Sequence, residues 1–237
     1  MPGLFEWNGS AFVERVPHHG EALALPAEVT IWDADLGQFH RIWPSYQESI
    51  HQYDTAGSFS LPVPSWARYA DVAVIGGGGG GGGRRSGSTN TGKGGGAAAW
   101  YAATAGPEWV TANSGLTVTV GDGGAGGPTS SPNTGIDGGL TRVWFGTTLF
   151  SSSNGGTGGA GHTSGSPTPG ANSSSISAFG QTFSGATGGD NGTGSIDASP
   201  GGAPGAGGGG AGGGFVNPAR AGGKGGTGRA YVRFRSM

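Results

Sequence analysis

The segment that comes closest to a known chemical motif is residues 87–94, Gly-Ser-Thr-Asn-Thr-Gly-Lys-Gly, which nearly match the phosphate-binding loop G-x-x-x-x-G-K-[ST]. Gly94 stands where the motif needs Ser or Thr, so the hydroxyl that would bind magnesium is missing. The glycines at 94–96 are also poor helix formers, whereas the motif holds phosphate at the N-terminus of a helix. We therefore expect neither nucleotide binding nor a cofactor.

Metal ligands and acid–base pairs are not spaced as a site would require. Asp33 and Asp35 lack the later acidic ligand of a calcium loop and predict a turn instead. Cysteine is absent, which excludes thiolate ligands and cysteine nucleophiles. The histidines do not show the spacing of a zinc site; they are His18, His19, His40, His51 and His162. We expect no metal, no catalytic residue and no enzymatic activity.

The composition is that of a glycine-rich chain with little charge. It has 57 glycines and 14 prolines in 237 residues, which reaches the range, about 25–30%, where disorder is the default expectation. Seven Trp, ten Phe and five Tyr oppose that default, because they can form a core. The net charge of −2 predicts neither nucleic acid nor an anionic membrane surface as a partner, and no apolar run approaches the roughly 20 residues that span a bilayer. We expect no membrane insertion.

The chain changes character at Gly76. Only five glycines precede it, Gly3, Gly9, Gly20, Gly37 and Gly57. Charge divides at the same point: residues 1–75 carry nine acidic and three basic groups, and residues 76–237 carry five acidic and nine basic groups. Together with the strand patterns below, this predicts an N-terminal β domain over residues 1–54 and a glycine-rich domain over residues 55–237.

Short β-strands predict a mainly β fold with almost no α-helix. A weak internal repeat, residues 4–13 and residues 29–42, has aromatic and β-branched runs around Asn-Gly or Asp and Gly, which predicts two β-hairpins. Further strands are predicted at residues 59–63, 71–75, 116–120, 141–145, 176–183 and 229–235. These can form a small β-sandwich.

The glycine-rich segments have a local period of three. In residues 121–127, 155–161 and 222–228, two positions in three are glycine and the third carries a side chain. In an extended helix with three residues per turn, this spacing leaves two edges bare, so that backbones can approach and hydrogen-bond to each other. We expect long glycine-rich loops that form a polyglycine II helix bundle; the alternative is a set of flexible linkers.

Aromatic and basic residues within the glycine-rich half are candidates for a binding surface. Residues 84–91, 97–113 and 162–175 are predicted loops between the glycine segments, and exposed aromatic residues on loops often mark binding surfaces. The candidates are Trp100, Tyr101, Trp109, Arg84, Arg85 and His162. The alternative is that the aromatic residues cap the bundle and shield its ends from water.

The order of these elements resembles the glycine-rich minor tail proteins of actinobacterial, mycobacteriophage-like siphophages. The resemblance rests on residues 59–63, residues 72–75 with the following glycine run, residues 118–127 and the closing strand at residues 229–234. Residues 7–13, Trp-Asn-Gly-Ser-Ala-Phe-Val, resemble an element near the N-termini of the same proteins.

The resemblance implies a structural virion protein at the distal end of a phage tail, bound to other phage tail proteins and assembled as a homotrimer. It also implies an adhesin role, in which the loops of a polyglycine helix bundle recognise a glycan or glycolipid of the host cell envelope. The alternative is a purely architectural tail protein that does not contact the host.

Overall fold

The computed structural model describes residues 4–7, 12–15, 29–33, 38–43 and 46–237. The chain divides into two compact units, Met1–Tyr46 and Gln47–Met237, and each is described here by itself. In the first unit, β1 (Leu4–Trp7) pairs antiparallel with β2 (Phe12–Arg15), and β3 (Val29–Asp33) pairs antiparallel with β4 (Gln38–Trp43). The two predicted hairpins are confirmed, and the residues predicted to form their turns lie outside the described residues.

The second unit begins with a strand that the sequence analysis assigned to the N-terminal domain. The strand β5 (Glu48–Tyr53) pairs antiparallel along its whole length with the last strand, β14 (Arg229–Arg235). The backbone N–H of Ser236 donates to the carbonyl of Gln47 at 3.0 Å, so the start and the end of the unit lie side by side. The compact unit therefore starts at Gln47, before the boundary expected at residue 54.

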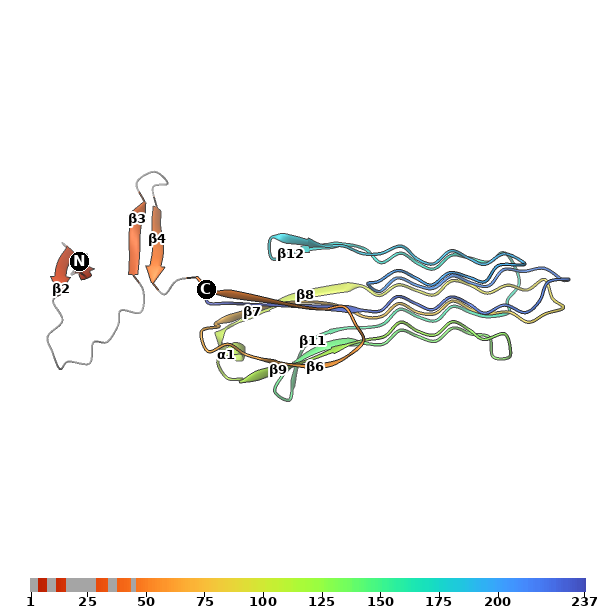
Figure 1. The fold of residues 1–237 in the computed structure, drawn as a ribbon, viewed down its shortest axis with the longest axis horizontal. Coiled ribbons are helices and arrows are strands. Elements are labelled where there is room, and N and C mark those ends of the chain that lie inside the picture. Colours follow the sequence, from red (N-terminus) through yellow and green to blue (C-terminus); the bar gives the residue numbers. More distant parts are fainter. Residues whose placement is uncertain (1–3, 8–11, 16–28, 34–37, 44–45) are drawn as a thin grey trace. The chain divides into compact units, whose positions relative to one another are not determined.

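Two four-stranded antiparallel sheets form the predicted sandwich (Figure 1). The first has the order β5-β14-β7-β8, where β7 is Tyr69–Ile75 and β8 is Trp100–Ala105. The second has the order β11-β10-β9-β6, formed by β11 (Thr148–Ser153), β10 (Thr141–Phe145), β9 (Gly115–Val120) and β6 (Gly57–Pro62). The predicted strands at residues 59–63, 71–75, 116–120, 141–145 and 229–235 are all present.

The hydrophobic core lies between the two sheets. Alternate residues of a strand point to the same face, so Val72 and Val74 of β7 pack with Val118 of β9 and Val143 of β10. All four side chains are fully buried. At one end of this core, the four-residue helix α1 (Pro107–Val110) adds the buried Val110. The expectation of almost no helix is met in the described part of the chain.

A third layer covers the outer face of the first sheet. The strands β12 (Ile176–Ala178) and β13 (Gln181–Phe183) form the antiparallel hairpin predicted over residues 176–183. Phe183 packs against Tyr231, with ring centroids 5.0 Å apart, and against Ala73 on the outward face of β7. Both faces of β7 are thereby covered. Residues that point to either face are therefore buried, which explains why the sequence of β7 is almost continuously apolar.

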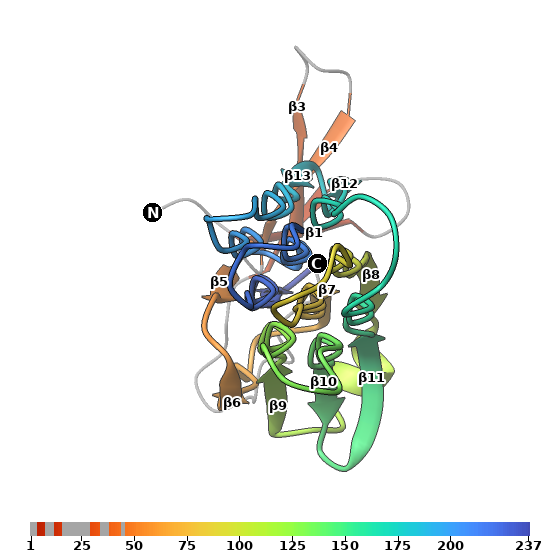
Figure 2. The same ribbon diagram turned by 90° about the vertical axis from the view of Figure 1, so that its right-hand side faces the viewer.

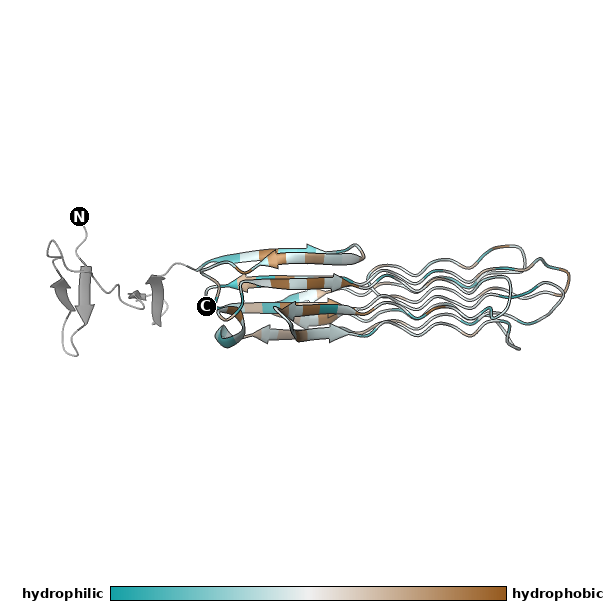
Figure 3. Cartoon of the chain, turned by 90° about the horizontal axis from the view of Figure 1, so that it is seen from below, coloured by the Kyte–Doolittle hydropathy of each residue, from teal (hydrophilic) through white to brown (hydrophobic). Residues whose placement is uncertain are grey.

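Beyond the sheets, the strands run directly into extended segments that lie side by side and end in turns at the opposite end of the unit (Figures 1 and 2). In Figure 3 these segments are pale, because glycine dominates them, whereas the strongly apolar residues are concentrated in the strands. The extended segments are residues 76–84, 91–99, 121–128, 133–140, 154–162, 168–175, 184–192, 197–202, 205–213 and 220–228.

Hydrogen bonds of segment 76–84 have the three-residue period that the sequence predicts. Successive backbone N–H groups point to three different neighbours, and every third one returns to the same neighbour. Residues 77, 80 and 83 donate to segment 133–140, residues 78, 81 and 84 to segment 220–228, and residues 79 and 82 to segment 91–99. The N···O distances are 2.7–2.9 Å. Three residues per turn is the geometry of the polyglycine II helix.

The carbonyl groups of the same segment point to three further neighbours. Residues 77, 80 and 83 accept from segment 154–162, residues 78 and 81 from segment 121–128, and residues 79 and 82 from segment 205–213. Neighbouring members of this ring are also bonded to each other, for example by the N–H of Lys93 and the carbonyl of Ala160 at 2.8 Å. Segment 76–84 is therefore the centre of a hexagonal array whose backbone groups satisfy one another.

This position explains the run of glycines at residues 76–83. A Cβ atom at any of these residues would lie 1.9–2.4 Å from the nearest backbone atom of a neighbouring segment, so no side chain fits on any of its three edges. Segments on the outside of the array have one free edge, and their non-glycine residues, such as Asp122, Ala125 and Thr157, are exposed. A segment that is covered by neighbours on more sides therefore contains a higher proportion of glycine.

Candidate functional site

The turns farthest from the sheets bring together side chains from several segments. These turns, residues 85–90, 129–132, 163–167, 193–196 and 214–219, are called the turn end below (Figure 2). The start and the end of the second unit lie at the opposite, sheet end, since Gln47 bonds to Ser236. The turn end is therefore the part of this unit most remote from its two chain ends.

Arg84 is the last residue of segment 76–84, and its side chain binds the turn at residues 214–219. Its side chain is fully buried, and its guanidinium donates to the carbonyls of Gly214 at 3.1 Å and Pro218 at 2.6 Å. It also lies 3.4 Å from the carbonyl of Ser88. Burial lowers the pKa of Arg84, and the positive charge of Arg220 adds to the effect. Arg84 acts as a clamp that fixes both ends of the turn at residues 214–219.

Arg85 and His162 lie next to each other at the turn end. The backbone N–H of Arg85 donates to Nδ1 of His162 at 3.3 Å. The guanidinium Nε of the exposed Arg85 donates to Oδ1 of the buried Asn133 at 2.9 Å. His162 has a positive φ of 50° and donates its backbone N–H to Gly83. Of the six candidates, the structure thus places Arg84, Arg85 and His162 at the turn end.

The structure separates the aromatic candidates from this group. Trp100 begins β8 and packs against Phe183, with ring centroids 5.4 Å apart. Trp109 lies in α1 and packs at the edge of the sandwich core against Phe145 and Phe150, at 5.9 and 5.2 Å. Tyr101 on β8 is exposed. Residues 97–113 were expected to form a loop, but most of them belong to a strand and a short helix at the sheet end.

The six candidates proposed from the sequence do not include three exposed apolar residues at the turn end. Val216 is 92% exposed, Phe215 68% and Ile196 64%, which makes them the most exposed large apolar residues in the described part of the chain. Phe215 already stood out as an aromatic residue within a glycine-rich stretch. Val216 and Ile196 had no such signal beyond an apolar residue in a predicted turn. Sequence spacing cannot show that two distant turns meet.

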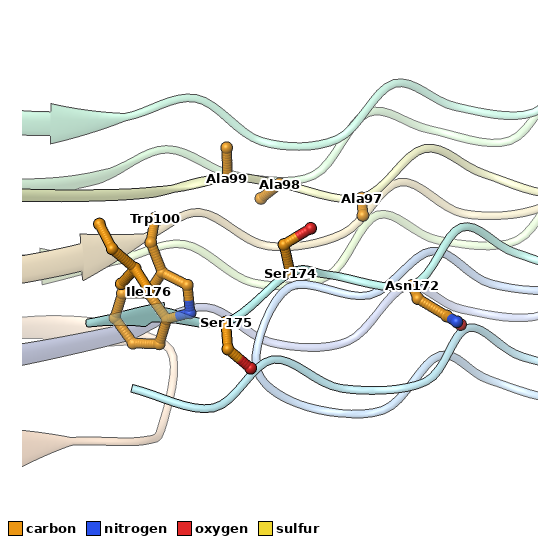
Figure 4. Close-up of a pocket in the computed structure, with 8 residues that line it drawn as sticks. All are labelled: Ala97, Ala98, Ala99, Trp100, Asn172, Ser174, Ser175 and Ile176. Atoms are coloured by element: carbon orange, nitrogen blue, oxygen red, sulfur yellow. The ribbon is translucent and has the colours of Figure 1, made fainter. Parts of the chain in front are cut away.

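A shallow cavity of about 380 Å³ opens where segment 91–99 meets β8 (Figure 4). Ala97, Ala98 and Ala99 line one side, and Trp100 and Ile176 line the end near the sheet. Asn172, Ser174 and Ser175 supply the polar atoms. The indole N–H of Trp100 is buried and has no hydrogen-bond partner. The cavity combines apolar and hydroxyl groups but has no ionisable residue.

The phosphate-loop-like residues do not form a phosphate site. Residues 85–90 are a turn, and the ammonium group of Lys93 donates a hydrogen bond to the carbonyl of Ser166. Gly94 continues an extended segment, with its N–H bonded to the hydroxyl of Thr168 at 2.8 Å. The helix that would present its N-terminus to a phosphate is therefore replaced by a segment whose N–H groups are already bonded.

Within the described residues, the structure has no group of three or more His, Asp or Glu side chains close enough to hold a metal ion. His18, His19 and Asp35 lie outside these residues. No helix in the described part is long and apolar enough to cross a bilayer. The buried Asp71 is bonded to Thr104, Arg233 and Arg235 on the outer face of the first sheet, which makes it a structural ion-pair centre.

A comparison with protein families matches residues 54–235 to a family described as a glycine-rich domain. This range contains every extended segment and all strands of the sandwich except β5. The chain belongs to the glycine-rich domain family. A search of curated proteins finds no match to the sequence. The glycine-rich domain described above is thus the part of the chain whose family is known, and its array of extended segments accounts for its composition.

Proposed function

We propose that this chain is a structural protein of a phage tail tip and that it contacts the host surface with its turn end. The observation that carries the proposal is the position of Phe215, Val216 and Ile196, which are exposed at the turn end of a hydrogen-bonded array. An array in which segment 76–84 is bonded on all sides is suited to hold such a surface at a fixed distance from the sheets. The resemblance to siphophage minor tail proteins supports the virion setting.

The first unit, with its two hairpins, is the proposed attachment to other tail proteins. The central segment finds all its hydrogen-bond partners within one chain, so the bundle does not need a second copy to close. The proposed homotrimer would then form through other surfaces, such as the sheets or the first unit. A purified chain that is trimeric in analytical ultracentrifugation would support this assembly, and a monomer at micromolar concentration would contradict it.

Binding of the full chain to actinobacterial cells tests the proposed contact. The informative variant carries Phe215→Ser and Val216→Ser, which removes apolar side chains that have no internal packing role. The matched control carries Ile50→Ser and Ile136→Ser, two exposed apolar residues on β5 and on the flank of the array. The proposal expects that the native chain and the control bind and that the turn-end variant does not. If the folded native chain binds to none of the cells, the chain is an architectural tail protein.

A further inference from the structure

Two turns of the turn end meet, and together they carry three exposed apolar side chains. A Cβ atom on Gly194 would lie 1.8 Å from Nδ2 of Asn217, so the turn at residues 193–196 touches the turn at residues 214–219. Arg220 connects the same turns, because its guanidinium donates to the carbonyl of Ser195 at 2.7 Å. Phe215, Val216 and Ile196 are called the apolar tip below. Single exposed apolar residues are ordinary, but the three most exposed ones gathered on adjacent turns indicate a contact surface.

Several polar groups beneath the apolar tip are paired, whereas Nε of Arg84 and Nε of Arg220 are buried without a partner. The carbonyls of Gly214 and Pro218 accept from Arg84, and the backbone N–H of Asn217 donates to Gly214 at 3.1 Å. The side-chain amide of Asn217 lies 3.3 Å from the carbonyl of Gly213. The turn is therefore held in one conformation, which lowers the entropy cost of binding. The large side chains that it exposes, Phe215 and Val216, are apolar.

Cationic side chains lie at the turn end together with the apolar tip. Arg85 is exposed, and Arg220 is partly exposed with a single carboxylate partner, Asp197 at 3.3 Å. Arg84 adds a buried positive charge directly behind the turn. The local charge is thus positive although the whole chain is weakly negative. A rigid apolar tip with arginines at the same end of the array combines the two features that bind proteins to the interface of an anionic lipid layer.

We propose that the ligand of the turn end is an anionic lipid surface. Phe215 and Val216 enter the boundary between headgroups and acyl chains, while Arg85 and Arg220 lie near the anionic headgroups. A polysaccharide fits less well, because it is recognised through hydrogen bonds, whereas the two most exposed large side chains of this turn, Phe215 and Val216, are apolar. This inference rests on the proposed function and names the chemistry of the surface that the turn end contacts.

Flotation of the full chain with vesicles tests the inference. One vesicle contains phosphatidylcholine alone, and the other contains phosphatidylcholine with phosphatidylglycerol. We expect binding to the anionic vesicle, weakened about tenfold or more by Phe215→Ser with Val216→Ser, because each lost side chain removes substantial apolar burial. Arg85→Gln should weaken binding about fivefold, and only to the anionic vesicle. The control with Ile50→Ser and Ile136→Ser should bind as the native chain does.

The outcomes separate this inference from the proposed function. No binding to either vesicle, or equal binding by the turn-end variant, overturns the lipid assignment. Cell binding that persists in that case, and that soluble envelope polysaccharide competes away, would leave the host contact in place with a glycan as its ligand. Vesicle binding without cell binding would keep the lipid surface and refute the proposed contact with those cells.

Discussion

Replacing one glycine of the central segment should cost much of the stability of the fold. A Cβ atom at Gly80 would lie 2.0 Å from the carbonyl oxygen of Ala125, whereas ordinary contact begins near 3.4 Å. Relieving the overlap by moving segment 121–128 requires a shift of about 1.4 Å, the difference of these two distances. The bonds that this segment donates to Gly78 and Gly81, at 2.8 and 2.7 Å, would then break.

The cost follows from the groups left without partners. An unsatisfied buried polar group costs about 1–3 kcal/mol, so losing two bonds in Gly80→Ala costs about 2–6 kcal/mol. The substitution also lowers the conformational entropy of the unfolded chain, which stabilises the fold by only about 0.4–1 kcal/mol. The net loss is therefore about 1–6 kcal/mol, which at its upper end is a large part of the stability of an ordinary domain, about 5–15 kcal/mol.

Calorimetry of the full chain measures this effect as a change in Tm. For Gly80→Ala we expect a Tm lower by roughly 5–15 °C, or a chain that does not fold. The matched control is Gly115→Ala, where the nearest atom to an added Cβ, the carbonyl oxygen of Leu61, is 3.5 Å away. The control should keep the native Tm or exceed it slightly. If both variants melted within about 1 °C of the native chain, the close packing of the central segment would be refuted.

Three further predictions concern single side chains. Arg84→Met leaves the carbonyls under the turn at residues 214–219 unpaired, so limited proteolysis should cut this turn faster than in the native chain, and an unchanged rate would contradict the clamp. Trp109→Ala should destabilise the fold by about 3 kcal/mol in denaturant titration, because the ring packs on Phe145 and Phe150; weaker cell binding at unchanged stability would instead make it a binding residue. Burial raises the pKa of Asp71, but hydrogen bonds from Thr104, Arg233 and Arg235 outweigh it and hold the pKa below its usual 3.8. A carboxyl whose pKa is lowered by folding stabilises the fold at pH values above its pKa in the unfolded chain, and this stability is lost as the pH falls through its pKa in the folded chain. Below about pH 4, the Tm of the native chain should therefore fall more steeply than the Tm of Asp71→Asn.

The strands could be predicted where their own residues carry the signal. Residues 71–75 and 229–235 are rich in β-branched and aromatic residues, and both are strands. Residues 100–105, Trp-Tyr-Ala-Ala-Thr-Ala, combine three strand-favouring residues with three alanines and were predicted as a loop. They form β8 because their backbone pairs with β7, which is a tertiary effect that local propensity does not contain.

The glycine segments were predictable in period but not in arrangement. Two glycines in three predict an extended helix with bare edges, and the unbroken run at residues 76–83 is explained by a segment enclosed on every side. Which segments become neighbours depends on the order of strands in two sheets. The candidate site shows the same limit: of the six candidates only Arg84, Arg85 and His162 lie at the turn end, whereas the apolar tip joins residues from turns far apart in the sequence.

Amide hydrogen exchange, followed residue by residue by NMR, tests the hydrogen-bonded array most directly. We predict slow exchange at every residue from 77 to 84, because each N–H is bonded to one of three neighbours. In the outer segment 220–228 we predict a period of three: Gly222, Gly223, Gly225 and Gly226 are protected, while Lys224 and Thr227, whose N–H groups donate no bond within the described structure, exchange fast. Exchange at the rate of an unstructured chain throughout residues 77–84 would mean that the glycines are flexible linkers and would contradict the account.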